Sequence, residues 1–216
     1  MNDADEDRLS VVEAALGRGE VVALPTDTVY GVGVLAGHRL AADRVFALKG
    51  RPETVALPVL VADLETAVQL ASADVIGLDL LGARLWPGAL TVVVPRREGL
   101  EWALGGDGRT IGIRCPDHDL LRRLLGRTGP LAVSSANRHG GSPATTPEDV
   151  RRIFGAGLLC LDAGRCDRPS STVVSLVGGK PSVIREGAVS LADVLRALDP
   201  AGGPVRRRPG GAGMAN

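Results

Sequence analysis

The chain has 216 residues, of which 44% are hydrophobic, so it is long enough for one good-sized domain or two small ones with a substantial core. Its 25 Lys and Arg residues balance its 25 Asp and Glu residues, and the net charge of zero argues against a protein that coats nucleic acid or a membrane. Aromatic residues make up only 2% of the chain, which is too few for the stacking surfaces of single-stranded nucleic-acid binders.

Cysteine and histidine usage argues against a disulfide framework or a structural zinc site. The three cysteines include no CxxC pair, and the three histidines stand apart in the sequence. The acidic start MNDADEDR lacks the basic residues and the apolar run of a signal peptide, and no apolar stretch approaches the ~18 residues of a membrane span. We therefore expect a cytoplasmic protein without membrane contact.

The first elements lead to a polar segment. Residues 1–7 are acidic and are expected to be disordered, and apolar residues then recur at helical spacing over residues 9–16. The run 21–24 has the length and composition of a buried strand, which Pro25 ends. The segment TDTVYGVG that follows puts hydroxyl groups and a carboxylate at the end of this strand, where open α/β sheets bind ligands. A polar turn without function is the alternative.

A second helix is predicted over residues 40–48, and it ends at the sequence Lys49-Gly50-Arg51-Pro52. Two cations just past a helix end have two interpretations. They complement the helix dipole on a solvated surface, or they clamp a phosphate, with Arg as a planar fork and Lys as a point charge.

Hydrophobic patterns predict the remaining elements. Further strands are expected at residues 57–61, 89–95, 110–114, 131–134, 158–162, 173–177 and 182–185, and further helices at 64–71, 74–85, 120–125, 147–154 and 191–198. The predicted helix N-caps are Asp63, Asp117 or Asp119, Thr146 and Ser190. For Arg114, at the end of a strand, a surface salt bridge with Asp117 or Asp119 is one interpretation, and His118 is interpreted as a capping or packing residue.

The strand at 131–134 runs directly into hydroxyl, amide and glycine residues, which together suit an anion cradle. The chain contains no GxxxxGK[ST] sequence and no GxSxG sequence. A P-loop ATPase and a hydrolase with a nucleophile elbow are therefore excluded at the level of motifs.

Seven segments, taken in order, resemble the YrdC/Sua5 family of threonylcarbamoyl-AMP synthases: PTDTVYGVG, KGRP, WPGALTVVVP, IGIRCPDH, SSANRHGG, STVV and IREG. They extend from Pro25 to Gly187, about three quarters of the chain. The resemblance implies one YrdC-like α/β domain over residues 8–198, with a twisted mixed β-sheet flanked by helices around a positively charged concave site. It implies the short, single-domain form of the family, because the chain ends too soon for the extra domain of longer members.

The resemblance also implies a reaction. L-threonine, bicarbonate and ATP, with Mg²⁺ held mainly by the nucleotide phosphates, give threonylcarbamoyl-AMP and pyrophosphate. A downstream tRNA threonylcarbamoyl-transferase complex then uses this product to modify adenosine 37 of tRNA. No metal ligands from the chain are expected.

The family motifs imply roles for individual residues. Catalysis would fall to Lys49 and Arg51. ATP would be bound by Lys49, Arg51, Thr110, Ser135, Asn137, Pro143 and Arg185. Threonine would be bound by Thr28, Arg114, Val133 and Ser171. The chain departs from the family pattern at Val55, Ala56, Leu60, His139 and Ser175.

Two other functions stay open. One is a binding protein for double-stranded RNA or the ribosome, and the other is a relative that carbamoylates a different acceptor. Residues 199–216 are rich in Pro, Gly and Arg and are expected to be a disordered tail, in which the arginines at 206–208 are candidates for a weak RNA contact.

Overall fold

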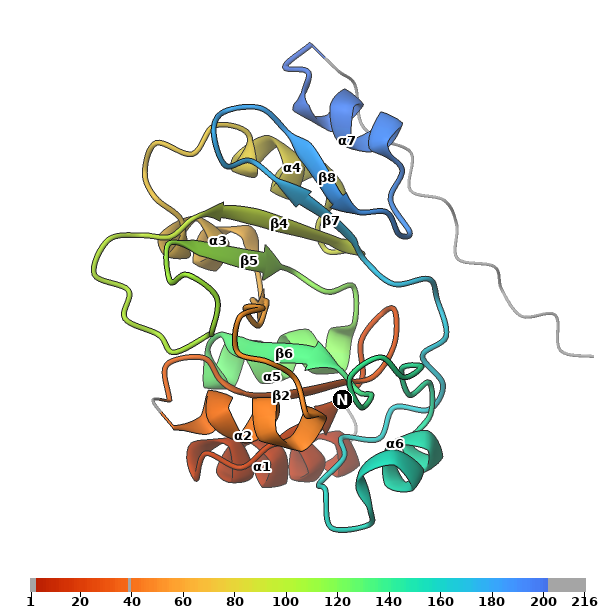
Figure 1. Ribbon diagram of the computed structural model, residues 1–216. Coiled ribbons are helices and arrows are strands. Elements are labelled where there is room, and N and C mark those ends of the chain that lie inside the picture. The colour runs from red at the N-terminus through yellow and green to blue at the C-terminus, as the bar shows by residue number, and fades with distance from the viewer. Residues whose placement is uncertain (1–2, 39, 202–216) are drawn as a thin grey trace, which may run out of the picture.

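The computed structural model describes residues 3–38 and 40–201, which fold around one mixed β-sheet with the strand order β1-β2-β6-β3-β5-β4-β7-β8 (Figure 1). The strands are β1 (Val22–Leu24), β2 (Gly31–Leu35), β3 (Val59–Leu60), β4 (Leu90–Pro95), β5 (Thr110–Arg114), β6 (Leu131–Ser135), β7 (Thr172–Ser175) and β8 (Ser182–Arg185). The helices are α1 (Asp3–Gly17), α2 (Ala41–Lys49), α3 (Leu64–Leu70), α4 (Leu78–Leu85), α5 (Asp119–Thr128), α6 (Pro147–Phe154) and α7 (Leu191–Leu198).

Strand pairing makes the sheet mixed, as the family resemblance predicted. The pairs β3–β5 and β4–β7 are parallel, and the other five pairs are antiparallel. The β7–β8 hairpin and α7 lie at one end of the molecule, and α1 and α2 lie at the other (Figure 1). The described helices include none that is long and apolar enough to cross a membrane.

Period-two alternation divides the apolar residues of the sheet between two cores. On one face, residues such as Val92, Ile113 and Ala132 pack with the apolar sides of α2, α3, α4 and α7. On the other face, Leu60, Leu131 and Val133 pack with α1 and α5.

The second core covers β1, β6 and β3. On the same face, β5, β4 and β7 present Gly112, Thr91, Val93 and Val173, and these residues form the floor of a cavity. One face of the sheet is thus covered by helices over β1, β6 and β3 and borders a cavity over β5, β4 and β7.

Most predicted elements are confirmed. The strand over residues 110–114 and the helix over residues 147–154 have the predicted bounds. Asp63, Thr146 and Ser190 accept the expected N-cap hydrogen bonds, and the side chain of His118, rather than an aspartate, caps α5.

The prediction of a disordered N-terminus was wrong for the residues that the structure describes, because α1 begins at Asp3. Acidic residues in its first turn favour the helix dipole, and Glu6 pairs with Arg123 and Arg127 of α5. Residues 202–216, including the arginines at 206–208, lie outside the described residues.

Two strand predictions also need correction. The segment 158–162 is not a strand, and it makes only one parallel bridge, between Cys160 and Ala23. Conversely, β2 was not predicted, because its glycines suggest a loop. A Cβ atom on Gly31 or Gly33 would lie 2.5 or 2.7 Å from a methyl carbon of Val133, so these glycines allow β2 to pair closely with β6.

The core between α1 and α5 provides a test of the fold. Leu124 is fully buried in this core, and we expect Leu124→Ala to lower the free energy of unfolding by about 3 kcal/mol, because it leaves a cavity. The same change at Leu195, which is 50% exposed on α7, should cost less than about 1 kcal/mol. Urea denaturation measures both values, and equal losses would contradict this packing.

Candidate active site

A cavity of about 470 Å³ opens over the uncovered part of the sheet, a volume in the range of small-molecule sites. Its walls come from the β1–β2 loop, the segment after α2, the ends of β5 and β6, and the β7–β8 hairpin. Nine of the predicted site residues line it: Thr28, Arg51, Thr110, Arg114, Val133, Ser135, Pro143, Ser171 and Arg185. The other two, Lys49 and Asn137, lie outside its lining.

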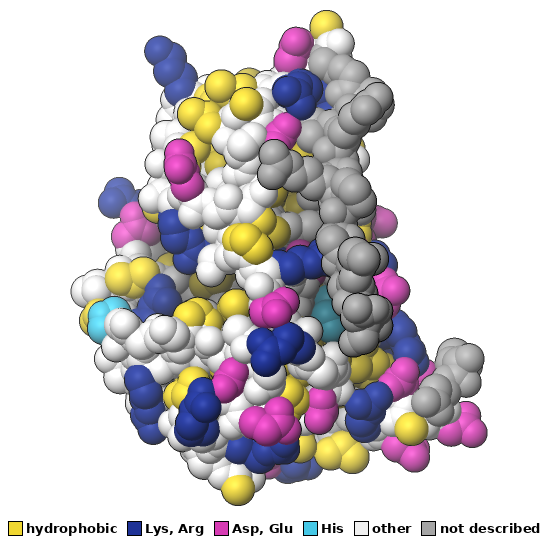
Figure 2. All heavy atoms as spheres, turned by 90° about the vertical axis from the view of Figure 1, so that its right-hand side faces the viewer, with side chains coloured by type: hydrophobic (Ala, Val, Ile, Leu, Met, Phe, Trp, Pro, Cys, Tyr) yellow, Lys and Arg dark blue, Asp and Glu magenta, His cyan; other side chains and the backbone are white. Residues whose placement is uncertain are grey.

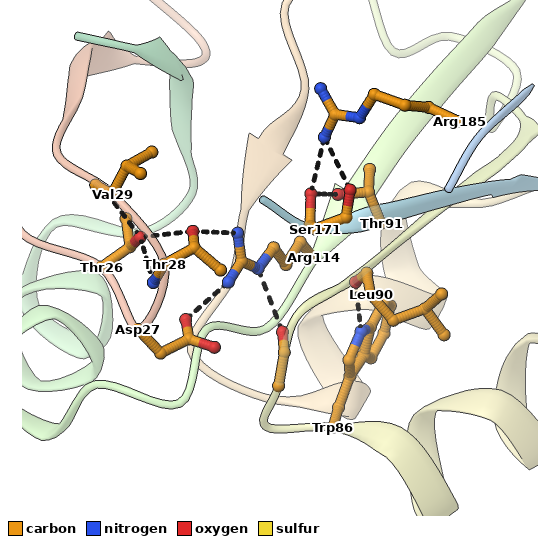
Figure 3. Close-up of polar contacts among 11 residues, drawn as sticks. Thr26, Asp27, Thr28, Val29, Trp86, Leu90, Thr91, Arg114, Ser171 and Arg185 are labelled. Atoms are coloured by element: carbon orange, nitrogen blue, oxygen red, sulfur yellow. Dashed lines mark hydrogen bonds and ion pairs between the residues drawn. The ribbon is translucent and has the colours of Figure 1, made fainter. Parts of the chain in front are cut away.

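Arg114 forms a buried ion pair at the bottom of the site (Figure 3). Its guanidinium donates to Asp27 Oδ1 at 2.6 Å, to Thr28 Oγ1 at 3.2 Å and to the carbonyl oxygen of Gly88 at 3.0 Å. The Arg114 and Asp27 side chains are only 7% and 5% exposed. The alternative interpretation of Arg114, a surface salt bridge with Asp117 or Asp119, is therefore wrong, and two of the five N–H groups of Arg114 stay available for a ligand.

The positions of Asp27 and Arg114 in the sequence already carry a signal for this pair. Asp27 follows β1, and Arg114 ends β5, so both side chains leave the sheet at strand ends. A carboxylate in a buried turn that is otherwise rich in hydroxyl groups needs a cationic partner. Arg114, at the end of an apolar strand, in turn needs an anionic partner. Which of the many arginines pairs with Asp27 depends on the strand order, which the sequence does not display.

Thr26 and Thr28 fix the direction of the hydrogen bonds around this pair. The Thr26 hydroxyl donates to the carbonyl oxygen of Val29 at 2.7 Å, so in its 2.9 Å contact with Thr28 it acts as the acceptor. The Thr28 hydroxyl therefore donates to Thr26 and accepts from Arg114. This series of hydrogen bonds fixes the orientation of the Arg114 guanidinium.

Lys49 and Arg51 hold the end of β6 from two positions. α2 ends at Lys49, and the C-cap residue Gly50 has a left-handed φ of 61°, which suits glycine. Beyond this turn, Arg51 donates to Ser134 Oγ at 3.1 Å and to the carbonyl oxygen of Ala56 at 3.3 Å, and it lines the cavity.

The Lys49 ammonium instead lies behind the cavity wall. It is 3% exposed and donates to the carbonyl oxygens of Ser135 and Asn137 and to Asn137 Oδ1. The structure therefore places Lys49 against Asn137 and the end of β6, and neither residue is among those that line the cavity. Burial and the nearby Arg51 charge lower the pKa of Lys49 to about 8.

Arg185 reaches the opposite rim of the cavity. Its Nη2 donates to the carbonyl oxygen of Ser171 at 2.7 Å and to Ser171 Oγ at 3.1 Å (Figure 3). Within the described ranges, neither Arg185 nor Arg51 has a carboxylate within 4.0 Å, whereas Arg114 is neutralised by Asp27. The cavity thus contains two uncompensated guanidinium groups, which suits an anionic ligand.

The departures from the family pattern fall into two groups. Val55, Ala56 and Leu60 line the cavity and make part of its wall apolar. His139 is exposed and donates its backbone N–H to the carbonyl oxygen of Lys49, and Ser175 accepts from the backbone N–H of Val177. The latter two residues lie outside the cavity lining, so their side chains do not change its shape.

Comparisons with known proteins agree over most of the chain. A family model for Sua5, YciO and YrdC proteins, described as "Telomere recombination", matches residues 14–187. A protein of Mycobacterium tuberculosis is 36% identical over 200 residues, which cover 91% of this chain and 92% of that protein. A threonylcarbamoyl-AMP synthase of Chromohalobacter salexigens is 37% identical over 181 residues, which cover 81% of this chain and 95% of the relative. The solved structure of Pyrococcus abyssi Sua5 complexed with L-threonine matches with a TM-score of 0.82 at 31% identity, over 88% of this chain and 57% of that one.

The buried ion pair predicts a large effect of Asp27→Asn. This change leaves the Arg114 charge without its partner, and we expect the free energy of unfolding to fall by about 3 kcal/mol. Asp107→Asn removes the same charge from a solvent-exposed pair with Arg109 and should change the free energy of unfolding far less. Guanidinium denaturation of both variants at pH 7 compares them, and similar losses would show that the Asp27 pair is not buried in solution.

The lowered pKa of Lys49 predicts a dependence of stability on pH. An unfolded lysine has a pKa of about 10.4, so between this value and 8 the unfolded chain binds a proton that the folded chain has released. The free energy of unfolding contributed by Lys49 therefore rises as the pH increases through this window.

Denaturation of the wild type and of Lys49→Met, measured from pH 7 to pH 10, tests this prediction. Burial also raises the pKa values of Tyr30 and of the three thiols, but these groups contribute equally to both proteins, so the difference between the two isolates Lys49. We expect the wild type to gain stability relative to the variant above pH 8. A difference that does not change with pH would mean that Lys49 keeps an ordinary pKa.

Proposed function

The chain belongs to the Sua5/YciO/YrdC family, and on that premise we propose that it is a threonylcarbamoyl-AMP synthase, a nucleotidyltransferase that forms threonylcarbamoyl-AMP and pyrophosphate from L-threonine, bicarbonate and ATP. The observation that carries this proposal is the charge arrangement of the cavity. Two uncompensated arginines, Arg51 and Arg185, accompany one neutralised arginine, Arg114, in a space of small-molecule size.

This arrangement suits two different anions. A triphosphate requires strong positive charge, which Arg51 and Arg185 supply from two rims. An amino-acid carboxylate requires fixed N–H donors more than net charge, and Arg114 offers its two available N–H groups while Asp27 and Thr28 hold it in place. We therefore assign the triphosphate to Arg51 and Arg185 and the threonine carboxylate to Arg114.

The reaction needs correct positioning of its two reactants, and it needs no nucleophilic side chain. Threonine that carries a carboxylate on its nitrogen attacks the α-phosphorus of ATP, and pyrophosphate leaves. Both reactants are anions, so the barrier comes largely from repulsion and orientation. In the proposed site, arginines reduce the repulsion, and the hydroxyls of Thr28, Thr110, Ser135 and Ser171 together with backbone groups near Val133 and Pro143 orient the reactants.

Lys49 and Asn137 act in this proposal through Ser135. Lys49 holds the carbonyl oxygen of Ser135, and Asn137 Oδ1 accepts from Ser135 Oγ at 2.6 Å. We therefore replace the expected phosphate contact of Lys49 with a positioning role, in which it keeps the nucleotide-binding end of β6 in place.

Mg²⁺ would enter the site on the phosphates of ATP. No group of three His, Cys, Asp or Glu side chains in the described part of the chain is arranged to hold a metal ion. When bound, the ion would share the neutralisation of the triphosphate with Arg51 and Arg185.

The product would serve the modification of adenosine 37 of tRNA through a downstream threonylcarbamoyl-transferase complex, and a cytoplasmic location rests on this proposed role. The alternative of a double-stranded RNA binder calls for a wide basic surface. On the face shown in Figure 2, Lys and Arg side chains are interspersed with Asp and Glu. This face therefore does not offer such a basic surface.

Pyrophosphate release tests the proposed function. The purified protein with Mg-ATP and bicarbonate should release pyrophosphate only when L-threonine is present. Arg51→Ala should lower kcat/KM about 100-fold, because it removes a donor from the triphosphate. Arg18→Ala, which removes an exposed arginine paired with Glu20, should leave the rate unchanged. Tight binding of duplex RNA without threonine-dependent release would favour the RNA-binding alternative, and release with another amino acid would indicate a different acceptor.

A further inference from the structure

A buried serine beside Arg51 has no role in the function described so far. Ser134 is the residue before the last one of β6, it is 5% exposed, and it lines the cavity. The family motifs imply a role for its neighbour Ser135 and none for Ser134. The Ser134 hydroxyl accepts a hydrogen bond from Arg51 Nη1 at 3.1 Å. It thus contacts the guanidinium that the proposed function assigns to the triphosphate.

Strand alternation places Ser134 on the face of the sheet that α2 covers. Side chains of β6 alternate between the two faces, so Ser134 shares a face with Ala132, which packs in the same core as α2. The chain leaves α2, turns at Gly50 and brings Arg51 to the end of this face. A buried hydroxyl on an apolar face needs a polar partner. Among the described residues, Arg51 is the only hydrogen-bond partner of the Ser134 hydroxyl.

Both uncompensated arginines of the cavity are held by neutral oxygen atoms. Arg51 donates to the hydroxyl of Ser134 and, at 3.3 Å, to the carbonyl oxygen of Ala56. Arg185 donates in the same way to the hydroxyl and carbonyl oxygens of Ser171 (Figure 3). A neutral acceptor fixes the direction of a guanidinium and leaves its charge intact, whereas a carboxylate would cancel that charge. Arg51 is therefore both oriented and fully charged.

We propose that Ser134 is a positioning residue, which holds the Arg51 guanidinium so that its remaining N–H groups point toward the triphosphate. After its two hydrogen bonds, Arg51 keeps three N–H groups for a ligand. A free arginine side chain has many rotamers, and ordering it on binding costs affinity, so a contact that orders it beforehand strengthens binding. This inference rests on the proposed function, which assigns the triphosphate to Arg51.

A double-mutant cycle separates positioning from a contact that Ser134 makes by itself. Ser134→Ala should lower kcat/KM about tenfold, the scale of one hydrogen bond to a charged group. Ser134→Thr keeps the hydroxyl and should restore most of the loss. In the Arg51→Ala background, Ser134→Ala should change kcat/KM less than about twofold, because no guanidinium is left to hold. Equal losses in the two backgrounds would overturn the proposal.

Ser175→Ala is the matched control. Ser175 is also a buried serine at the end of a strand, β7, and it lies outside the cavity lining. Its loss should leave kcat/KM unchanged, and a fall as large as that of Ser134→Ala would show that any buried serine of the sheet supports activity. If Ser134→Thr does not fold, the cycle still decides, because it needs only the alanine variants.

Equilibrium binding of Mg-ATP without threonine keeps this inference separate from the proposed function, since it needs no turnover. Ser134→Ala should raise the Kd about tenfold, and the double variant should bind as Arg51→Ala does. Binding of Mg-ATP by the wild type without threonine-dependent pyrophosphate release would overturn the synthase alone. A Kd of Ser134→Ala equal to that of the wild type would overturn the positioning role alone, and a wild type that does not bind Mg-ATP would overturn both.

Discussion

The ion pair between Arg114 and Asp27 is the interaction on which the site depends. It joins the end of β5 to the β1–β2 loop, and the carbonyl oxygen of Gly88 adds the turn before β4, so three segments distant in the sequence meet at one guanidinium. Because the pair is buried, its geometry is held by hydrogen bonds rather than by solvent. It also sets the charge pattern, since it leaves Arg114 neutralised while Arg51 and Arg185 carry the excess positive charge.

The cavity exists because one face of the sheet is covered along only part of its width. Helices α1 and α5 pack over β1, β6 and β3, and the same face of β5, β4 and β7 presents the small residues Gly112 and Thr91. A large apolar side chain at either position would fill the floor. The floor of the site is therefore formed by the sheet itself, and its ligand groups come from strand ends, from the β1–β2 loop and from the segment after α2. Groups supported by a rigid sheet suit a reaction that depends on the positioning of its reactants.

Much of this structure follows from local patterns in the sequence. The alternating strand over residues 110–114 and the capping box of α6 were predictable, because strand periodicity and N-cap chemistry act within a few residues. β2 was missed because its glycines serve contact with Val133 on β6, a tertiary reason that no local pattern displays. Nine of the eleven predicted site residues line the cavity, and they were found through the family motifs rather than through physical reasoning alone.

Lys49 shows why a motif does not by itself fix a role. The sequence KGRP places two cations one residue apart, yet the left-handed turn at Gly50 sends them to different surroundings. Arg51 faces the cavity, while Lys49 is enclosed by three oxygens of Ser135, the last residue of β6, and of Asn137 just after it. An ammonium suits this enclosure, because the three donors on one small group match the two main-chain carbonyl oxygens and the amide oxygen around it. The wall that positions Ser135 thus depends on a cation that the ligand need not touch.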